Sequence, residues 1–476
     1  MLFNSFPFLA LFGAFLVVYY ATAAPYRWWL LLAASLGLYA TQGSLFVPLL
    51  VGTSAIAYVG ALAIERRDGA ARRLATTTAV VAVVAILVFF KYYDFLADGV
   101  STLLTTVGVR MPRPKRLGLP AVAGLSFYVF SCVSYLVDVS RGTLPAERHP
   151  GQFLLYVSFF PKLLAGPIER AGTFLAQVRR PRPLVPEQLW SGLHTFAWGL
   201  FKKVVIADGL ATFVDAAYGR PALAAPSDLL IGTYFEALQI YGDFSGYSDM
   251  AIGLARMLGI DLLENFRRPY FSRSVPEFWS NRWHLSLAYW FRDYLYFPLG
   301  GSRTAWPRHA LNVMAVFAVS GLWHGASWTF VAWGLLNGLY VASTVVVQRL
   351  RPSWHAAWDR LPVPLQVFAT FHLVLLTWVF FRATSLADAW TVMTRIAGAG
   401  ASLPLQVWQR LGTDHVVMLV LCAGMFAVEW FEEREPVRLR LLRAPVSLRW
   451  AYYYAIVGLL LVCGSWQVRQ FVYMQF

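Results

Sequence analysis

The chain has 476 residues, of which 58% are hydrophobic, 16% aromatic and only 14% charged. An average soluble domain carries about 25% charged residues, so this composition excludes an ordinary soluble protein and indicates a polytopic membrane protein. The 40 basic and 25 acidic residues give a net charge of +15. The basic residues gather in short loops, and retention of such loops on the cytoplasmic face of a membrane explains most of this excess charge. We therefore expect membrane lipids but no nucleic acid as partners.

The first 95 residues are predicted to be scaffold helices, at 2–20, 28–40, 45–64 and 76–93. The first of them lacks a basic start and a small-residue cleavage site, so we expect it to be retained as a span. A cytoplasmic basic loop at 66–73 places the N-terminus outside. The next basic loop, at 110–116, would then lie outside, against the rule for basic loops. We therefore expect that successive helices no longer cross the membrane in strict alternation after the fourth span.

Residues 118–335 are the expected catalytic core, because ionisable residues appear there inside apolar stretches. Such residues are costly in a bilayer and usually face a bundle interior or a water-filled cavity. Residues 159–170, rich in Pro and Gly, are predicted to form a re-entrant segment. The C-terminal part, 336–476, resumes the hydrophobic pattern, and one integral membrane domain is expected to cover 1–476. Its later spans are predicted near 331–347, 363–381, 415–430 and 452–466.

A strong cluster of aromatic and charged residues occupies 277–301 and includes Arg282, His284, Ser286 and Tyr294. Read as a single helix, this stretch places its tryptophans and Tyr294 on one face. A helix lying at the membrane interface, anchored by its aromatic side chains, is the structural alternative. His284 fits that alternative less well, since it stands between Arg282 and Ser286 near a helix-breaking Pro-Leu-Gly-Gly sequence.

His324 lies in a Gly-rich break between two apolar helical stretches, next to Trp323. It is the only acidic, basic or histidine side chain between His309 and Arg349. Burial disfavours the charged form of an imidazole, and a neutral imidazole can accept a proton from a hydroxyl group. The sequence therefore favours a general base, although a core histidine bonded to a backbone carbonyl remains the alternative.

Two carboxylates, Asp243 and Asp249, occur with hydroxyl residues inside an apolar stretch, where burial without a purpose is expensive. Their spacing of six does not make them neighbours on one helical face, so no glycosidase pair is indicated. One of them could orient a histidine; ion pairs with Arg267, Arg268 or Arg273 are the alternative.

Lys202 and Lys203 suit either an interfacial helix end or a cofactor phosphate on the cytoplasmic side. The three cysteines stand singly, so neither a disulfide framework nor a zinc site is expected. Nucleophile-elbow, Walker and Rossmann motifs do not occur in the sequence. A soluble hydrolase, an ATP-driven pump and a dehydrogenase therefore lose support.

The chain resembles the membrane-bound O-acyltransferase (MBOAT) family, and within it the bacterial branch that acetylates exported polysaccharides such as alginate. The Trp-His pairs of two of the matching stretches make the resemblance specific. The stretches are Leu-Ser-Phe-Tyr (125–128), Ser-Tyr-Leu-Val-Asp (134–138), Phe-Phe-Pro (159–161), Ala-Gly-Pro-Ile (165–168), Gly-Leu-Phe-Lys-Lys (199–203), Asp-Phe-Ser-Gly-Tyr-Ser-Asp-Met (243–250), the block 278–301, Gly-Leu-Trp-His-Gly (321–325) and Phe-Phe-Arg-Ala (380–383).

The resemblance implies an all-α membrane fold: a rosette of about ten to twelve tilted transmembrane helices, with re-entrant and interfacial helices, around a central funnel. His324 matches the catalytic histidine of the family and His284 its second, supporting histidine. The remaining candidates for supporting or substrate-binding roles are Asp249, Asp243, Trp323, Arg282, Ser286, Tyr294, Lys202 and Lys203.

We expect an acyltransferase of a bacterial inner membrane that takes acetyl from cytoplasmic acetyl-CoA, with no bound cofactor and no metal. His324 would act as base or as relay, and His284 would orient the thioester or polarise its carbonyl. The acceptor is a polysaccharide, reached directly or through a periplasmic serine-type acetyltransferase working with export machinery. D-alanyl or peptidoglycan O-acyl transfer, a proton-linked transporter and a purely structural anchoring subunit are the alternatives.

Overall fold

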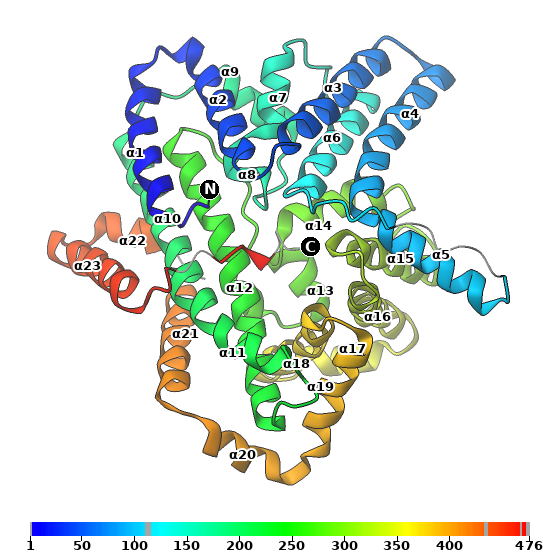
Figure 1. Ribbon diagram of the computed structural model, residues 1–476, viewed down its shortest axis with the longest axis vertical. Coiled ribbons are helices and arrows are strands. Elements are labelled where there is room, and N and C mark those ends of the chain that lie inside the picture. The colour runs from blue at the N-terminus through cyan, green and yellow to red at the C-terminus, as the bar shows by residue number, and fades with distance from the viewer. Residues whose placement is uncertain (1, 110–115, 433–436, 467–468, 473–476) are drawn as a thin grey trace. The chain divides into compact units, whose positions relative to one another are not determined.

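The computed structural model of the protein describes residues 2–109, 116–432, 437–466 and 469–472 and is helical throughout (Figure 1). The strand-like pairing found in these residues is one isolated antiparallel bridge, between Phe266 and Trp283. The all-α expectation is thereby confirmed. The predicted loop at 110–116 falls mostly outside the described residues, as does Arg434.

The chain folds into two compact units, one of Met1–Leu189 with Leu254–Leu263 and one of Trp190–Gly253 with Glu264–Val472. The single domain expected from the sequence stays a prediction. The helices of the first unit are α1 (Phe6–Ala21), α2 (Arg27–Ala40), α3 (Phe46–Glu65), α4 (Gly69–Leu87), α5 (Tyr93–Thr106), α6 (Leu125–Ser140), α7 (Pro150–Ser158), α8 (Phe160–Leu163) and α9 (Ala171–Arg179), with a 3-10 turn η1 (Ala24–Tyr26) and a π-helical turn η2 (Val88–Tyr92).

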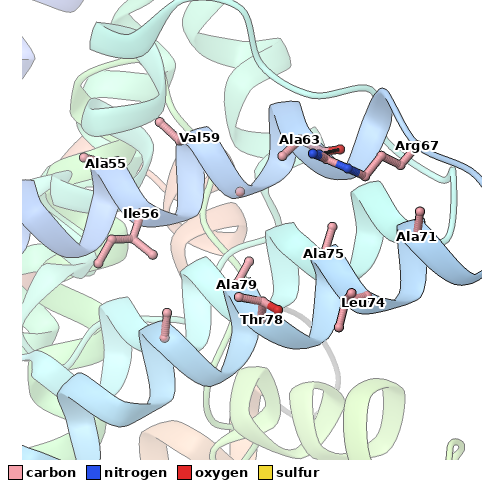
Figure 2. Close-up of a pocket in the computed structure, with 12 residues that line it drawn as sticks. Ala55, Ile56, Val59, Ala63, Arg67, Ala71, Leu74, Ala75, Thr78 and Ala79 are labelled. Carbon is pink, nitrogen blue, oxygen red and sulfur yellow. Dashed lines mark hydrogen bonds between the residues drawn. The ribbon is translucent and has the colours of Figure 1, made fainter.

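Helix α6 is the core of the first unit, because nearly all of its side chains are buried. It packs beside α3 and α4 (Figure 1). Close packing of α3 on α4 depends on small residues: a Cβ atom added to Gly60 would lie 2.8 Å from the Cβ of Ala79. Along the same pair runs an apolar groove of about 700 Å³, with Arg67 near one end (Figure 2).

The second unit holds all the candidate site residues. Its helices are α10 (Pro186–Phe201, which starts in the first unit), α11 (Asp208–Tyr218), α12 (Pro226–Met257), α13 (Val275–Glu277), α14 (Leu285–Phe291), α15 (Trp306–His324), α16 (Trp328–Leu350), α17 (Pro352–Asp359), α18 (Val363–Arg382), α19 (Leu386–Gly398), α20 (Leu403–Arg410), α21 (Thr413–Glu432), α22 (Val437–Arg443) and α23 (Val446–Cys463). Shorter turns are η3 (Lys202–Ala207), η4 (Pro269–Phe271), η5 (Phe278–Arg282), η6 (Arg292–Tyr296) and η7 (Gly400–Ser402).

Residues 277–301 do not form the single helix that the sequence suggested, and this expectation is wrong. The stretch breaks into α13, η5, α14 and η6, with extended backbone at Trp283 and a left-handed residue at His284 between η5 and α14. Each π-helical turn ends with a hydrogen bond back to its first residue. The Trp283 amide donates to the Phe278 carbonyl oxygen at 2.8 Å, and the Phe297 amide donates to the Arg292 carbonyl oxygen at 2.9 Å. Because of these breaks, the direction of each side chain no longer follows the 3.6-residue period of a continuous helix.

Helices α15 and α16 form an antiparallel pair joined by the short turn that the Gly-rich break predicted. Glycines let the two backbones approach: a Cβ on Gly334 would lie 3.0 Å from the Cα of Gly321, and the carbonyl oxygen of Phe317 would be nearer still. The Ser327 hydroxyl begins α16 by accepting the Thr329 amide at 3.3 Å.

Six helical segments among the described residues are long and apolar enough to cross a membrane, which confirms a polytopic membrane protein. The predicted number of about ten to twelve spans stays a prediction, since shorter apolar helices such as α1 and α6 are not among the six. The six segments are Phe46–Glu65, Gly69–Thr106, Trp328–Leu350, Val363–Arg382, Thr413–Glu432 and Val446–Cys463.

Candidate active site

His324 is the last residue of α15 and is only 4% exposed. The helix ends there because Gly325 takes an extended backbone conformation, with a φ of −164°. A side chain at position 325 would collide with the ring of Phe330, which lies 2.2 Å from an added Cβ atom. The glycine therefore lets the start of α16 close over the histidine.

His284 is the residue immediately before α14 and is 2% exposed. Its position follows from the break in the 277–301 stretch, which ends η5 and begins α14 on either side of it. The two histidines are forty residues apart in the sequence, yet both line one cavity of about 580 Å³. The fold thus brings together the two residues that the sequence singled out.

The cavity is bounded by the 276–296 segment and by one face each of α15 and α16. Along α15 its lining residues recur with helical spacing from His309 to His324, which at about 1.5 Å per residue is a length of about 22 Å. The polar or ionisable residues on its wall, besides the two histidines, are Ser280, Asn281, Tyr289, Arg292, Tyr296, His309, Ser320, Thr344 and Gln348.

Aromatic rings surround both imidazoles. The ring centroid of His284 lies 4.6 Å from that of Phe244 and 5.9 Å from that of Trp323. The ring of His324 lies 4.9 Å from Trp323, 4.9 Å from Trp333 and 5.5 Å from Phe381. Both imidazoles are therefore packed against aromatic rings.

Trp279 forms part of the cavity wall and is held in place by a buried amide. Its indole nitrogen donates to Oδ1 of Asn337 at 3.0 Å, while Nδ2 of Asn337 donates to the Trp333 carbonyl oxygen at 2.8 Å. Asn337 is fully buried. Asn337 was not predicted from the sequence, because one asparagine within an apolar helix carries no pattern that distinguishes it.

The other predicted residues of the 277–301 block support its backbone. The Arg282 guanidinium donates to Glu277 at 2.7 Å and to the carbonyl oxygens of Arg267 and Arg268 at 3.3 and 3.4 Å. The backbone amide of Ser286 donates to Asn265, and the ring of Tyr294 packs 5.3 Å from that of Trp290. None of Arg282, Ser286, Tyr294 and Trp323 is among the described residues that line the cavity.

Lys202, Lys203, Asp243 and Asp249 form buried ion pairs, and they too are outside the described cavity lining. Lys203 donates to Asp243 at 2.6 Å and to Asp208 at 2.8 Å, and Lys202 pairs with Asp249 at 2.5 Å. Asp243 also accepts the Val472 amide at 2.7 Å. The two aspartates thus pair with lysines of the π-helical turn η3. Arginines were the partners considered from the sequence.

His309 and Ser320 are polar residues of the cavity wall that were not candidates from the sequence. Nε2 of His309 and the Tyr296 hydroxyl share a hydrogen bond of 2.8 Å. On the same wall, the Arg292 guanidinium lies 5.0 Å from the ring centroid of Tyr289. Ser320 lies one helical turn before His324. The spacing of His309, Ser320 and His324, at i, i+11 and i+15, is a helical-face signal that could have revealed them.

An internal cavity in a helical membrane protein, with two buried histidines facing it, is typical of an intramembrane enzyme. The model of MBOAT, the membrane-bound O-acyltransferase family, matches residues 117–385. Probable alginate O-acetylase AlgI of Azotobacter vinelandii is 39% identical over 408 residues, covering 84% of this chain and 79% of that protein. The chain therefore belongs to the membrane-bound O-acyltransferase family and is an O-acyltransferase.

Two further relatives have names that give other acceptors. Peptidoglycan O-acetyltransferase of Helicobacter pylori is 34% identical over 403 residues, which cover 79% of this chain and 74% of that protein. Teichoic acid D-alanyltransferase of Bacillus subtilis is 27% identical over 274 residues, covering 54% of this chain and 68% of that protein. The resemblance stated from the sequence motifs is confirmed at the level of the family.

Proposed function

We propose that the protein transfers acetyl groups from cytoplasmic acetyl-CoA, across a bacterial inner membrane, to alginate or a closely similar exported polysaccharide. The observation that carries this proposal is the shared cavity, with His284 and His324 on its wall. Alginate is favoured over peptidoglycan and teichoic acid because the relatives with the higher identity, at 38–39%, have alginate O-acetylase names.

In the proposed reaction, a hydroxyl oxygen attacks the thioester carbonyl carbon while His324 takes the hydroxyl proton. His284 donates a hydrogen bond to the carbonyl oxygen, where negative charge develops in the tetrahedral intermediate. Collapse of the intermediate breaks the carbon–sulfur bond, and His324 returns the proton to the sulfur as free thiol leaves. The attacking hydroxyl belongs to the sugar itself or to the serine of a periplasmic acetyltransferase that passes acetyl on.

The charges of the α15–α16 pair support entry of the donor from the cytoplasm. The sequence at the open end of this helix pair, residues 301–309 and 348–360, carries five arginines and one aspartate. The joining turn between His324 and Trp328 carries no acidic or basic residue. By the positive-inside rule the arginine-rich end faces the cytoplasm, and the cavity extends from it to His324.

At that arginine-rich end, the cavity wall carries Arg292, His309 and Gln348. The Arg292 side chain is 51% exposed and donates from Nε to Asp293 at 2.8 Å, so an entering anion would compete with the Asp293 carboxylate for it. Arginines are well suited to bind phosphate, so this end is the proposed location for the coenzyme A phosphates. Lys202 and Lys203 are less suited, since both lysines are buried as well as paired with carboxylates.

The proposal is tested with purified protein in vesicles, acetyl-CoA and alginate oligosaccharides, by measuring thiol release and acetylated sugar by mass spectrometry. We expect thiol release that depends on the acceptor, or on an added periplasmic serine-type acetyltransferase. Peptidoglycan fragments and a neutral glucan serve as comparison acceptors. Absence of thioester consumption with every acceptor, with and without the partner, contradicts the proposal and favours a transporter or an anchoring subunit.

A further inference from the structure

His284 has an unusual backbone conformation, with a φ of 47° and a ψ of 55°. Among the non-glycine residues that the structure describes, only His284 and Arg268 have a positive φ. A side chain in this left-handed region costs free energy, and it persists only where the surrounding structure enforces it. Some neighbouring group must therefore hold the backbone at His284.

The segment that faces His284 is 265–268, which runs antiparallel to 282–286. The Arg267 amide donates to the Arg282 carbonyl oxygen at 2.9 Å, Phe266 forms its bridge with Trp283, and the Leu285 amide donates to the Asn265 carbonyl oxygen at 2.9 Å. The second left-handed residue, Arg268, lies in this same segment. The two strained positions therefore belong to one small paired structure.

Asn265 is the member of this pair that acts through its side chain as well. Its Oδ1 accepts the Ser286 amide at 3.3 Å, and its Nδ2 donates to the Ser248 hydroxyl on α12 at 3.1 Å. Asn265, Ser248 and Ser286 are each 1% exposed. The amide side chain thus joins the start of α14 to α12 in a site from which water is excluded.

The start of a helix leaves backbone amides that need an acceptor, and the residue before the helix usually supplies one from its own side chain. His284 occupies that place before α14 but makes no such bond. Asn265 supplies two acceptors instead, its carbonyl oxygen for Leu285 and its Oδ1 for Ser286. The imidazole of His284 is left to line the cavity.

We infer that Asn265 is a positioning residue: by capping α14 in place of His284 and enforcing the left-handed backbone there, it aims the imidazole into the cavity that His324 shares. The inference rests on the proposed function only in that His284 assists the transfer. Asn265 itself touches neither substrate nor reacting atoms; it acts through the backbone of residues 284–286.

The test compares Asn265→Ala with Asn312→Ala, a matched control. Asn312 is also buried, at 2% exposure, and its Nδ2 donates to the Gly301 carbonyl oxygen at 3.2 Å, but it does not contact the His284 turn. We expect Asn265→Ala to lower kcat for acetyl transfer about tenfold or more with KM changed less than threefold. Asn312→Ala should change kcat less than threefold at a similar loss of thermal stability.

A double-mutant cycle separates positioning from a general structural effect. If Asn265 acts through His284, Asn265→Ala adds no loss of kcat in a His284→Ala background. Ser248→Ala, which removes only one bond of the Asn265 amide, is the milder variant should Asn265→Ala fail to fold; we expect a two- to fivefold loss that also vanishes in the His284→Ala background. Additive losses overturn the inference.

A cryo-electron microscopy structure of Asn265→Ala, or of Ser248→Ala, gives a readout that does not depend on turnover. Departure of residue 284 from the left-handed region supports the inference, and an unchanged backbone at 284–286 overturns it. Failure of the proposed function is seen differently, as absence of thioester consumption by the parent enzyme itself. The two failures are therefore distinguishable.

Discussion

His324 and His284 reach their shared cavity by different local means. His324 ends a regular helix at Gly325, which leaves room for the ring of Phe330, and packs against Trp333 of α16. His284 stands at a strained turn whose amides bond to Asn265. The first environment was legible in the sequence as a glycine beside a lone histidine. The second was not, because the partner of the turn comes from a segment about twenty residues earlier.

At this scale the proposed chemistry makes a direct prediction for His324. Replacing it with alanine removes the base while leaving the cavity walls in place, so kcat for acetyl transfer should fall by about 10²- to 10⁴-fold with little change in KM. The measurement is thiol release by protein purified to matched amounts and matched thermal stability.

The control for that variant is His372→Gln. His372 is a half-buried histidine of α18 whose Nε2 bonds to the Tyr234 hydroxyl at 2.8 Å, and it is absent from the described cavity lining. We expect activity within about twofold of the parent, as for substitutions away from the site. Parental turnover by His324→Ala would remove the histidine from the mechanism.

At the scale of the element, the packing of α15 on α16 decides where the His324 end of α15 lies. Its two backbones meet at Gly321 and Gly334, where an added Cβ atom on either residue comes within 3.2 Å of the other's Cα. Gly321 is one turn before His324, so the crossing point and the site move together. Interiors are too well packed to absorb such an insertion without displacement.

Gly334→Ala should therefore lower both thermal stability in detergent and kcat, with an overpacking cost of about 1–3 kcal/mol. Gly424→Ala in α21 is the matched control, since it is also a helical glycine of the second unit and an added Cβ there has no neighbour within 4 Å. That control should be neutral or slightly stabilising, because alanine is the better helix former. Equal behaviour of the two variants contradicts the close-packing role.

At the scale of the whole molecule, the distribution of charge predicts which way the chain faces. The arginines of 301–309 and 348–360 lie at the open end of the α15–α16 pair, and a second basic stretch, 434–449, follows α21. Helices α16, α18 and α21 are all long enough to span. From 348–360, the two successive crossings by α18 and α21 return the chain to the same side, so both basic stretches are predicted to face the cytoplasm.

This orientation is checked by cysteine labelling in intact cells, in a background with Cys463→Ser that keeps the buried Cys132 and Cys422. A cysteine at Ser302, in the exposed arginine-rich loop, should react with a membrane-impermeant maleimide only after the membrane is opened. A cysteine at Ala326, in the turn after His324, should react from outside. The reverse labelling pattern would place the donor entrance on the wrong side and contradict donor entry from the cytoplasm.

The sequence by itself determined the class of this protein, because hydrophobic runs, composition and histidine-containing motifs are local properties that need no contacts to be read. It located the helices at 46–65, 363–382 and 413–432 almost to the residue, and it selected His284 and His324. Tertiary structure alone decided that the two histidines face one cavity, that 277–301 breaks into short turns, and that Lys203 bonds to Asp208 and Asp243. These features depend on hydrogen bonds and packing between residues far apart in the chain, such as Asn265 with Ser286, and helical periodicity carries no information about such pairs.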